Sequence, residues 1–520
     1  MKVLGLNAFH ADSAAALLED GAFVTGVEEE RLNRVKHWAG FPEQAIRAVL
    51  QDGGTALDEV EHVAISRDPK AHFVDKALFA LRHRVRPSTV RSRIANLRHV
   101  SGTGAHLEAI LGNGLRARVH QVEHHRAHLA SAFFCSPFEE AACLTVDGFG
   151  DFVSSMSAVG RGATLTPIDE VTFPHSLGIL YTAVTQFLGF PHYGDEYKVM
   201  GLASYGRPEQ LPELRRLAQP ATDGRFELDT RFFRHASDGV TMTWPGGAPE
   251  IGPLWSDRLR ELLGPAREPG TDLTERHQNI AASLQALYEA ILLHRLRWLQ
   301  KRTGLTKLCL AGGCALNSVA NGRILTETGF TDVFIQSAAG DAGTALGAAL
   351  WVWHQELGHP RRFVMEHSYW GPQFAESRVI ASLASRLAGF DRTSTDQQCG
   401  EIHLTRDDCE ERLCRDTARA IADGHIVGWY QGRGEWGPRA LGNRSILADP
   451  RRPEMKDVLN ARIKRREPFR PFAPSILAER VGDYFEQSHL DPFMVTVYPI
   501  RAERRAEIPA VTHVDGTGRL

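Results

Sequence analysis

The sequence predicts an α/β protein in which one folding unit occurs twice. Residues 3–29 are predicted to form strand, turn, strand, turn and strand, because VLGLN, AAALL and FVTGVEE are apolar runs separated by polar turns. Residues 143–170 repeat this plan with CLTVD, FVSSMSAVG and a third strand. Farther along the chain, strands lead through glycine-rich turns into helices, as in parallel α/β units. These observations predict two hairpin-based sheets joined by helical crossovers.

The repetition resembles the actin- and hexokinase-like ATPase fold, in which two ribonuclease-H-like halves clamp a nucleotide. Each copy begins with a buried strand that ends in polar residues and is followed by a hairpin. A fold of this kind brings the polar turns of its hairpins to the cleft between the halves.

The segment between the copies is predicted to be helical, and we interpret its basic stretch at residues 82–98 as a solvated helix. Residues 272–303 are predicted to form a long helix. Its apolar positions include Leu284, Leu287, Ile291 and Leu292.

Two strand–turn–helix units follow this helix. The strand Leu308–Leu310 continues into AGGCALNSVANG, and the strand Val333–Ile335 continues into QSAAGDAGTALGAAL before a helix from about Thr344. Strand ends and helix N-termini of this kind suit contact with phosphate or ribose. The sequence therefore predicts nucleotide binding near these turns.

A domain boundary is predicted in residues 359–400, which read as polar and irregular, with prolines, glycines and a Ser/Thr/Asp cluster. Residues 1–358 then form the first domain. Residues 401–520 form a second α/β domain, which includes the strand Ile426–Tyr430.

The most informative segment of this second domain is Gly432–Arg444, GRGEWGPRALGNR. Glycines let backbone N–H groups approach an anion, and arginines grip phosphate oxygens with two parallel hydrogen bonds. A second basic run, KRREPFRPFAP, carries Lys464 and Arg470 on a proline-stiffened loop. A solvated basic face is the alternative interpretation. The interleaved glycines, the tryptophan and the lone Glu435 favour an oxyanion pocket.

Composition limits the classes of function. The 520 residues are 43% hydrophobic and 24% charged, with a formal net charge of −3, which argues against general nucleic-acid or membrane-surface binding. No apolar run approaches the roughly 18–20 residues that a membrane helix needs. The N-terminus enters a strand pattern without a signal-peptide layout, and the seven cysteines include no C-x-x-C pair. We therefore expect reduced thiols and a cytoplasmic protein.

His124 and His128 have the spacing that places two imidazoles on one face of a helix. No glutamate follows the first histidine as in H-E-x-x-H, so metalloprotease chemistry is not indicated. The pair alone is as compatible with a structural role as with metal binding. Asp147 at a strand end and Asp341 in a glycine-rich loop could complete a mixed N/O site for a divalent metal. As turn or N-cap residues, these aspartates would need no metal.

His10 and Asp12 lie in the turn of the first hairpin, where the predicted fold brings residues to its cleft. Lys36 and His37 follow the acidic run Glu28–Glu30. A histidine beside an aspartate could serve as a general base toward an alcohol.

Motifs that run in order over nearly the whole chain are similar to those of a known family. They are NAFHADSAAALLEDG, EEERLNRVKHWAGFP, EHHRAHLASAFF, LTVDGFGD, DEYKVMGLASYG, AGGCALN, GDAGTALGAA, GEWGPRALGNRSILADPR and REPFRPFAPSIL. Together they resemble the NodU-type O-carbamoyltransferases of antibiotic and nodulation-factor biosynthesis. The resemblance implies an N-terminal actin-like carbamoyl-transfer domain and a C-terminal YrdC-like domain. It also implies that carbamoyl phosphate and ATP, the latter with Mg²⁺, are joined into carbamoyl-adenylate before the carbamoyl group passes to an alcohol.

Residue roles follow from this resemblance by position. The expected metal ligands, for Fe(2+) or another divalent metal, are His124, His128, Asp147 and Asp341. The transferred group would lie beside His10, with Asp12 and Lys36 as neighbours. The adenosine would contact Gly312, Gly313 and Asn317, and the anions would be held by Arg439, Lys464, Arg470 and Arg519. Family members usually continue for a few dozen residues beyond THVDGTGRL, through a serine-bearing loop, so the resemblance leaves the adenylation site incomplete at this end.

The resulting hypothesis is an ATP-dependent O-carbamoyltransferase that acts on a natural-product alcohol, with a homodimer left open. One alternative is a tRNA threonylcarbamoyl-type enzyme, which would normally divide its activities between separate chains. The acidic net charge also gives no broad tRNA footprint. The other is a non-catalytic actin-like nucleotide-binding regulator, for which neither a metal tetrad nor arginine loops are needed. The identity of the acceptor cannot be read from the sequence.

Overall fold

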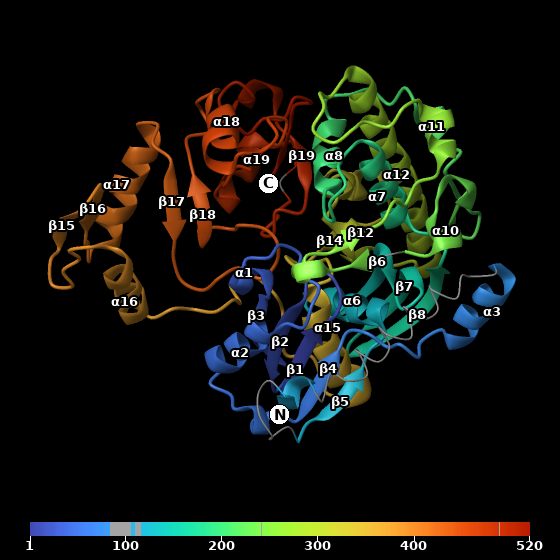
Figure 1. Ribbon diagram of the computed structural model, residues 1–520, viewed down its shortest axis with the longest axis horizontal. Helices are drawn as coiled ribbons and strands as arrows, with labels where there is room; N and C mark the ends of the chain where they lie inside the picture. Colours follow the sequence, from blue (N-terminus) through green and yellow to red (C-terminus); the bar gives the residue numbers. More distant parts are fainter. Residues whose placement is uncertain (84–105, 110–115, 241, 488) are drawn as a thin grey trace.

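The computed structural model describes residues 1–83, 106–109, 116–240, 242–487 and 489–520, and most of the basic stretch at 82–98 lies outside them. The described part is a mixed α/β structure with two five-stranded sheets, so the predicted α/β class is confirmed. Figure 1 shows the two sheets below and beside a C-terminal region that carries smaller elements.

The first sheet has the strand order β3-β2-β1-β4-β5. Strand β1 pairs antiparallel with β2 and parallel with β4, so a hairpin lies on one side of β1 and crossover strands lie on the other. The strands are β1 (Lys2–Asn7), β2 (Ala14–Glu19), β3 (Ala22–Glu28), β4 (His62–Ile65) and β5 (Arg118–Gln121). The helices in this part of the chain are α1 (Glu30–Asn33), α2 (Glu43–Asp52) and α3 (Phe73–His83).

The second sheet has the order β14-β13-β6-β7-β8 and the same strand directions. Strand β6 occupies the place of β1, and its hairpin follows in the chain as the sequence predicts. The strands are β6 (Glu140–Gly150), β7 (Val153–Arg161), β8 (Thr164–Thr172), β13 (Lys307–Ala311) and β14 (Asp332–Phe334).

Two buried helices, α6 (His124–Phe133) and α15 (Gly343–Trp351), pack against each other and against the two sheets. Small residues permit the close approach. A Cβ at Gly347 would collide with the carbonyl of Ala127 on α6, and a Cβ at Gly5 would collide with the carbonyl of Ala345. The beginning of α6 and the loop before α15 are thereby held close together.

The predicted long helix is α12 (Glu275–Thr303), and Leu284, Leu287, Ile291 and Leu292 are buried in the core as expected. It packs on α7, α8 and α9. The elements between the second hairpin and α12 are α7 (Leu177–Phe187), α8 (Glu196–Ala203), α9 (Leu211–Leu214), β9 (Ala218–Pro220), β10 (Phe226–Leu228), α10 (His235–Asp238), β11 (Met242–Thr243), β12 (Glu250–Ile251) and α11 (Asp257–Leu263). After β13 come α13 (Ser318–Asn321) and α14 (Ile324–Glu327).

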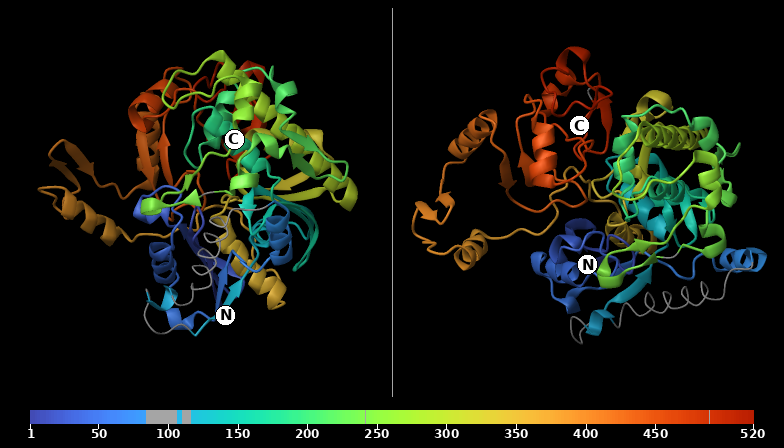
Figure 2. Two further views of the ribbon diagram at one scale, coloured as in Figure 1. Left: turned by 45° about the vertical axis from the view of Figure 1, so that its right-hand side comes forward. Right: turned by 45° about the horizontal axis from the view of Figure 1, so that its top comes forward.

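The segment 359–400 differs from its prediction as polar and irregular. It contains α16 (Glu376–Arg386) and β15 (Asp396–Cys399). Val379, Ile380 and Leu383 recur at helical spacing among polar residues, an amphipathic pattern that the prediction of an irregular segment did not include. Figure 2 shows this segment, with β16 (Ile402–Thr405) and α17 (Glu410–Ala422), extending away from the rest of the chain.

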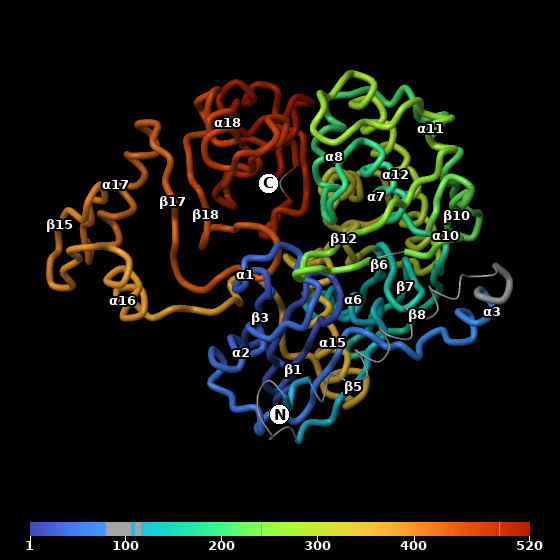
Figure 3. Tube along the Cα trace, in the orientation of Figure 1, coloured from blue at the N-terminus to red at the C-terminus, as the bar shows by residue number. Residues whose placement is uncertain are grey.

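The remaining C-terminal elements are short, and they pack around two small clusters, one centred on Phe485 and Ile500, the other on Met455 and Leu459. They are β17 (Val427–Tyr430), β18 (Arg444–Leu447), α18 (Met455–Val458), α19 (Val481–Tyr484), β19 (Val497–Pro499) and β20 (Thr517–Arg519). The trace in Figure 3 shows the red C-terminal segment beside the green segment that carries α8. The Lys456 ammonium donates to the hydroxyl of Tyr205, just after α8, at 3.0 Å.

Candidate functional site

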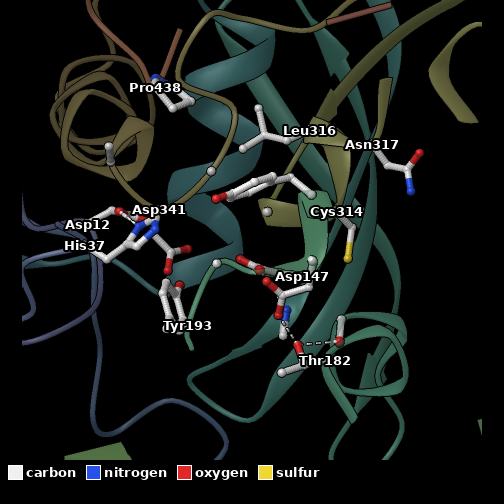
Figure 4. A pocket seen from close by; sticks show the side chains of 18 of the residues that line it. Asp12, His37, Asp147, Thr182, Tyr193, Cys314, Leu316, Asn317, Asp341 and Pro438 are labelled. Atoms are coloured by element: carbon white, nitrogen blue, oxygen red, sulfur yellow. Dashed lines mark hydrogen bonds and ion pairs between the residues drawn. The ribbon is translucent and has the colours of Figure 1, made fainter. Parts of the chain in front are cut away.

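One cavity of about 1880 Å³ connects the turns of both hairpins with the basic loops of the C-terminal region. Figure 4 shows Asp12, His37 and Tyr193 on one side of the pocket, Asp147 and Cys314 on another, and Pro438 from the arginine–glycine segment above them. The cavity thus brings together residues that are far apart in the sequence.

A cluster of possible metal ligands lies in the wall of this cavity, where α6, the end of β6 and the loop before α15 meet. The ligand atoms of its four members lie within 4.8 Å of one another. His128 Nε2 is 2.9 Å from Asp147 Oδ2 and 3.4 Å from Asp341 Oδ1. His124 Nε2 is 3.5 Å from each of the same two oxygens. The structure therefore brings His124, His128, Asp147 and Asp341 together.

Local structure fixes these side chains. The Glu123 side chain caps α6 by accepting hydrogen bonds from the backbone amides of His125 and Arg126 at 3.0 and 2.8 Å. His124 and His128 are one helical turn apart and point the same way. A Cβ at Gly150 would collide with the His124 ring, so glycine is needed there for the β6 hairpin to reach the helix.

The donor set fits a divalent cation. The Nε2 atoms of His124 and His128 face each other at 3.1 Å, and the buried Asp341 Oδ1 has no hydrogen-bond partner among the described residues. Two imidazole nitrogens and two carboxylates that converge in this way match the ligands that first-row divalent metals accept. Although burial and the neighbouring Asp341 act against it, the two histidines hold the pKa of Asp147 below its usual range. The Asp147 side chain is therefore ionised at neutral pH.

The first hairpin turn places its polar residues next to this cluster. His10 Nδ1 lies 2.9 Å from Asp341 Oδ2, and the His10 ring centroid is 5.2 Å from that of His124. Asp12 Oδ1 lies 2.7 Å from His37 Nδ1. Lys36 also lines the cavity, with its ammonium 5.3 Å from the centroid of the Tyr197 ring.

The residues expected at the adenosine occupy the turn after β13. Gly313 and Asn317 line the cavity, whereas Gly312 is packed so tightly that a Cβ would collide with the Val146 carbonyl. The Asn317 amide forms a reciprocal pair with the Gln285 amide, both hydrogen bonds being 3.0 Å long. Asn317 also caps α13. Both polar atoms of the Asn317 amide are therefore hydrogen-bonded within the protein, although the residue also lines the cavity.

The basic residues expected to hold anions also lie in the wall of this cavity. They are Arg439, Lys464, Arg470 and Arg519. Burial lowers the pKa of Arg439 to about 10. Burial and the nearby Arg439 and Arg466 lower the pKa of Arg519 well below its usual range. Cations so placed favour an anionic ligand.

Sequence reasoning missed several residues of the site. Arg466 lies within the basic run but was not singled out. Burial, followed by the charge of Arg470, lowers its pKa to about 10. Tyr197 on α8 has the Arg470 guanidinium 4.3 Å from its ring centroid, in addition to Lys36. Tyr197 lies in the motif DEYKVMG, but the sequence pattern alone does not show that its side chain lines the cavity.

Comparisons with known proteins show the family of the chain. The family described as "Carbamoyltransferase N-terminus" matches residues 2–350, and the one described as "Carbamoyltransferase C-terminus" matches residues 418–520. Together they cover most of the chain, which therefore belongs to the carbamoyltransferase family and is a carbamoyltransferase. The family predicted from the sequence motifs is confirmed.

Among its relatives, nodulation protein NolNO of Sinorhizobium fredii is 38% identical over 99% of this chain and 70% of its own length. A protein of Synechocystis without an assigned function is 40% identical over the whole chain and 86% of its own length. Nodulation protein U of Bradyrhizobium diazoefficiens is 28% identical over the whole chain and 86% of its own length. The solved structure of HypF from T. kodakarensis is a distant likeness, with 13% identity, a TM-score of 0.33 and coverage of 69% of this chain and 48% of its own.

Within the described ranges, no helix is both long and apolar enough to cross a bilayer.

Proposed function

We propose that the protein is an ATP-dependent O-carbamoyltransferase that forms carbamoyl-adenylate and then transfers the carbamoyl group to the hydroxyl of a small natural-product alcohol. The observation that carries this proposal is that one cavity is lined both by a metal-type donor set and by several poorly neutralised arginines. A regulator that only bound a nucleotide would need neither the donor set nor a cavity that connects it with the basic loops.

The C-terminal part is assigned the first reaction. We assign residues 401–520 to a YrdC-like domain and residues 359–400 to the boundary region. Arg439, Lys464, Arg470 and Arg519 would bind carbamoyl phosphate and the phosphates of Mg²⁺-bound ATP, because arginine forks match phosphate oxygens. Water would first cleave carbamoyl phosphate into carbamate and phosphate. A carbamate oxygen would then bond to the α-phosphorus of ATP while the bond from this phosphorus to the bridging oxygen of the β-phosphate breaks, so that pyrophosphate leaves and carbamoyl-adenylate remains.

The N-terminal part is assigned the transfer. We assign residues 1–358 to an actin-like domain, which is supported by the identical strand order of its two sheets. His124, His128, Asp147 and Asp341 would hold a divalent ion such as Fe(2+), which would supply positive charge beside the phosphoryl oxygens of the leaving group. Gly313 and Asn317, with the turn at Gly312, would accommodate the adenosine.

We assign to His10 the role of general base, which takes the proton of the acceptor hydroxyl. Asp341 Oδ2, which lies 2.9 Å from His10 Nδ1, orients the ring. As the alcohol oxygen bonds to the carbamoyl carbon, its proton passes to His10. The bond between this carbon and the phosphoryl oxygen breaks, and AMP leaves with the electron pair. Asp12 and Lys36 would bind and orient the reactants beside this centre.

The proposal can be tested with a panel of hydroxylated natural products. The protein is incubated with ATP, Mg²⁺, carbamoyl phosphate and each alcohol, while pyrophosphate release and product mass are followed. We expect pyrophosphate release that requires carbamoyl phosphate, and a product that gains one carbamoyl group. Carbamoyl transfer without ATP consumption would refute the adenylate route, and transfer to unmodified tRNA instead of small alcohols would refute the acceptor class.

A further inference from the structure

A group of aromatic rings lies in the same cavity as the metal-type cluster, and the reaction proposed above does not use it. The rings, which all line the cavity and are called the aromatic wall below, are those of Phe79, Phe149, Phe152, Phe173 and His235. In β6, Phe149 follows Asp147 of the metal-type cluster by two positions. The aromatic wall therefore begins beside the cluster.

The phenylalanine rings pack against one another around Phe173. The centroid of its ring lies 4.8 Å from that of Phe79, 5.0 Å from that of Phe149 and 5.7 Å from that of Phe152. Phe173 is buried, whereas the three rings around it are only half-buried. These three rings therefore present apolar surface to the cavity.

The hairpin turn that carries Phe152 has a backbone conformation that suits glycine better. Gly150 pairs with Val153 across the β6–β7 hairpin. The two residues between them, Asp151 and Phe152, form the turn, with φ of 50° and 88°. Positive φ at both positions is the mark of a type I′ turn, in which the second residue is usually glycine because other side chains are strained there.

The β2–β3 hairpin contains the same kind of turn with the preferred glycine. Its two turn residues, Asp20 and Gly21, lie between the paired Glu19 and Ala22 and have φ of 51° and 83°. Phenylalanine at position 152 thus carries a conformational cost that glycine would avoid. Because strain of this kind tends to accumulate at functional sites, we look for the role of Phe152 in its side chain.

The surroundings of the aromatic wall leave its rings as the groups that a ligand can contact. Asp151 Oδ2 accepts hydrogen bonds from two backbone amides, at 2.7 and 3.1 Å, the second of which belongs to His124. The guanidinium of Arg234 donates to the Asp238 carboxylate at 3.2 Å. Burial lowers the pKa of His235 to about 4, so its imidazole is uncharged at neutral pH.

We propose that the aromatic wall is a subsite for an aryl group of the acceptor, and that Phe152 determines specificity there. The acceptor is then an alcohol that carries an aromatic ring: the ring packs on Phe149 and Phe152, while the hydroxyl reaches His10 beside the metal-type cluster. Aromatic rings favour edge-to-face and offset contacts with one another, which saturated rings and polyols cannot make in the same way. This inference rests on the proposed transfer to an alcohol.

The test compares three alcohols with the whole chain as enzyme and synthetic carbamoyl-adenylate as donor. Phenethyl alcohol carries an aromatic ring, cyclohexylethanol carries a saturated ring of similar size, and glycerol carries no ring. The value of kcat/KM is measured for each alcohol. Binding of phenethyl alcohol is also measured by isothermal titration calorimetry, which does not depend on turnover.

Three variants isolate the Phe152 ring. Phe152→Gly removes the ring and gives the turn the Asp-Gly sequence that already forms the β2–β3 turn, so the backbone of the variant is not strained. Phe152→Tyr keeps an aromatic ring and is the conservative variant. Phe374→Gly is the control, because it makes the same chemical change at an exposed phenylalanine outside the cavity. Urea-unfolding midpoints and metal content establish that each variant is folded.

We expect the wild-type protein to prefer phenethyl alcohol to cyclohexylethanol by about twofold to tenfold in kcat/KM, the gain that aromatic pairs add to the burial of area. Phe152→Gly should remove this preference and weaken the calorimetric binding of phenethyl alcohol. In the same variant, kcat/KM for phenethyl alcohol relative to that for glycerol should fall by about tenfold, because apolar area of one phenylalanine is lost from the contact. Phe152→Tyr and Phe374→Gly should keep the preference.

Three results would overturn the proposal. Equal kcat/KM values for the two ring alcohols in the wild type would show that the aromatic wall does not select an aryl group. A Phe152→Gly variant that keeps the preference would exclude Phe152 as its source. A wild-type preference for glycerol over both ring alcohols would exclude an aryl acceptor. Failure of the proposed function is distinguishable, because no alcohol would then be carbamoylated, whereas calorimetry would still report binding of phenethyl alcohol that Phe152→Gly weakens.

Discussion

The carboxylate of Glu28, at the end of β3, accepts a hydrogen bond of 2.7 Å from the backbone amide of Gly437 in the arginine–glycine segment. The guanidinium of Arg31 on α1 binds the Gly437 carbonyl, so both backbone polar groups of Gly437 are held by the segment that runs from β3 into α1. Trp436 is fully buried and packs edge-on against the Phe23 ring, with centroids 5.9 Å apart. The segment that carries Arg439 is thereby fixed to the domain that carries His10.

The first prediction concerns the pH dependence of this contact. Burial raises the pKa of Glu28 above 4.5, against the opposing effects of Arg31 and the Gly437 amide. The Glu28 carboxyl group therefore binds its proton more tightly in the folded protein than in the unfolded chain, and this difference stabilises the folded state. The stabilisation is fully present below pH 4.5 and is lost as the pH rises through the folded-state pKa of Glu28.

The substitution Glu28→Gln keeps an oxygen that can accept the Gly437 hydrogen bond and removes the ionisation. Urea-unfolding midpoints of the variant, measured from pH 4.5 upward, should therefore rise relative to those of the wild type as the pH increases. The exposed Glu250→Gln serves as the control and should run parallel to the wild type. A constant difference between Glu28→Gln and the wild type would show that Glu28 does not titrate as inferred.

Local rules were enough to predict much of the fold and the approach of the cluster residues. Hydrophobic runs separated by turns predict the β1–β3 and β6–β8 hairpins, because alternation and turn chemistry act over a few residues. The helical spacing of His124 and His128 fixes their common face. The strand end at Asp147 and the glycine-rich loop at Asp341 meet that face because parallel strands end at one edge of a sheet.

Contacts between distant segments could not be predicted in the same way. The pairing of His37 with Asp12 depends on how the loop after α1 folds back over the first hairpin turn, and no local pattern encodes this. The same holds for Glu28 and Gly437, which are separated by 409 residues. Helix α16 has an amphipathic pattern, but the prolines, glycines and polar cluster around it in residues 359–400 led to a prediction of irregular structure.

The second prediction concerns the metal. His128→Ala should lose the bound divalent ion and the transfer step while the protein stays folded, because an alanine removes one of four converging ligands. Elemental analysis of freshly purified protein measures the ion, and circular dichroism reports the fold. His294→Ala, which removes a histidine bound only to the Ala221 carbonyl among the described residues, is the control and should retain the ion. Wild-type protein that contains no metal and keeps full activity in a chelator would contradict the assignment.

The third prediction concerns the transfer base. His10→Asn should lower carbamoyl transfer by about 10²–10⁴, the usual cost of removing a general base. Pyrophosphate release from carbamoyl phosphate and ATP should stay near the wild-type rate, because this reaction is assigned to the basic loops of the C-terminal region, which the substitution leaves unchanged. Both rates can be followed on one preparation. Near-normal product formation by His10→Asn would exclude His10 as the base.

The fourth prediction concerns the division of labour between the two domains. Arg439 is partly buried. Its guanidinium donates to the Leu316 carbonyl at 3.3 Å, while its buried Nε has no hydrogen-bond partner in the described part of the chain. A cation that is so incompletely paired is suited to an anionic ligand. Removing it should cost on the order of 1.5–3 kcal/mol in the binding of carbamoyl phosphate or ATP.

Arg439→Ala should therefore lower pyrophosphate release that depends on carbamoyl phosphate by about tenfold to a hundredfold when carbamoyl phosphate and ATP are below saturation. The same variant should still carbamoylate an acceptor when carbamoyl-adenylate is supplied, because His10 and the metal-type cluster are untouched. Arg451→Ala, which removes an arginine paired with Asp449 outside the cavity, is the matched control and should behave as the wild type in both assays. If Arg439→Ala instead releases pyrophosphate normally and cannot use the supplied intermediate, then Arg439, held against Leu316, serves the transfer step and the two domains have the opposite roles.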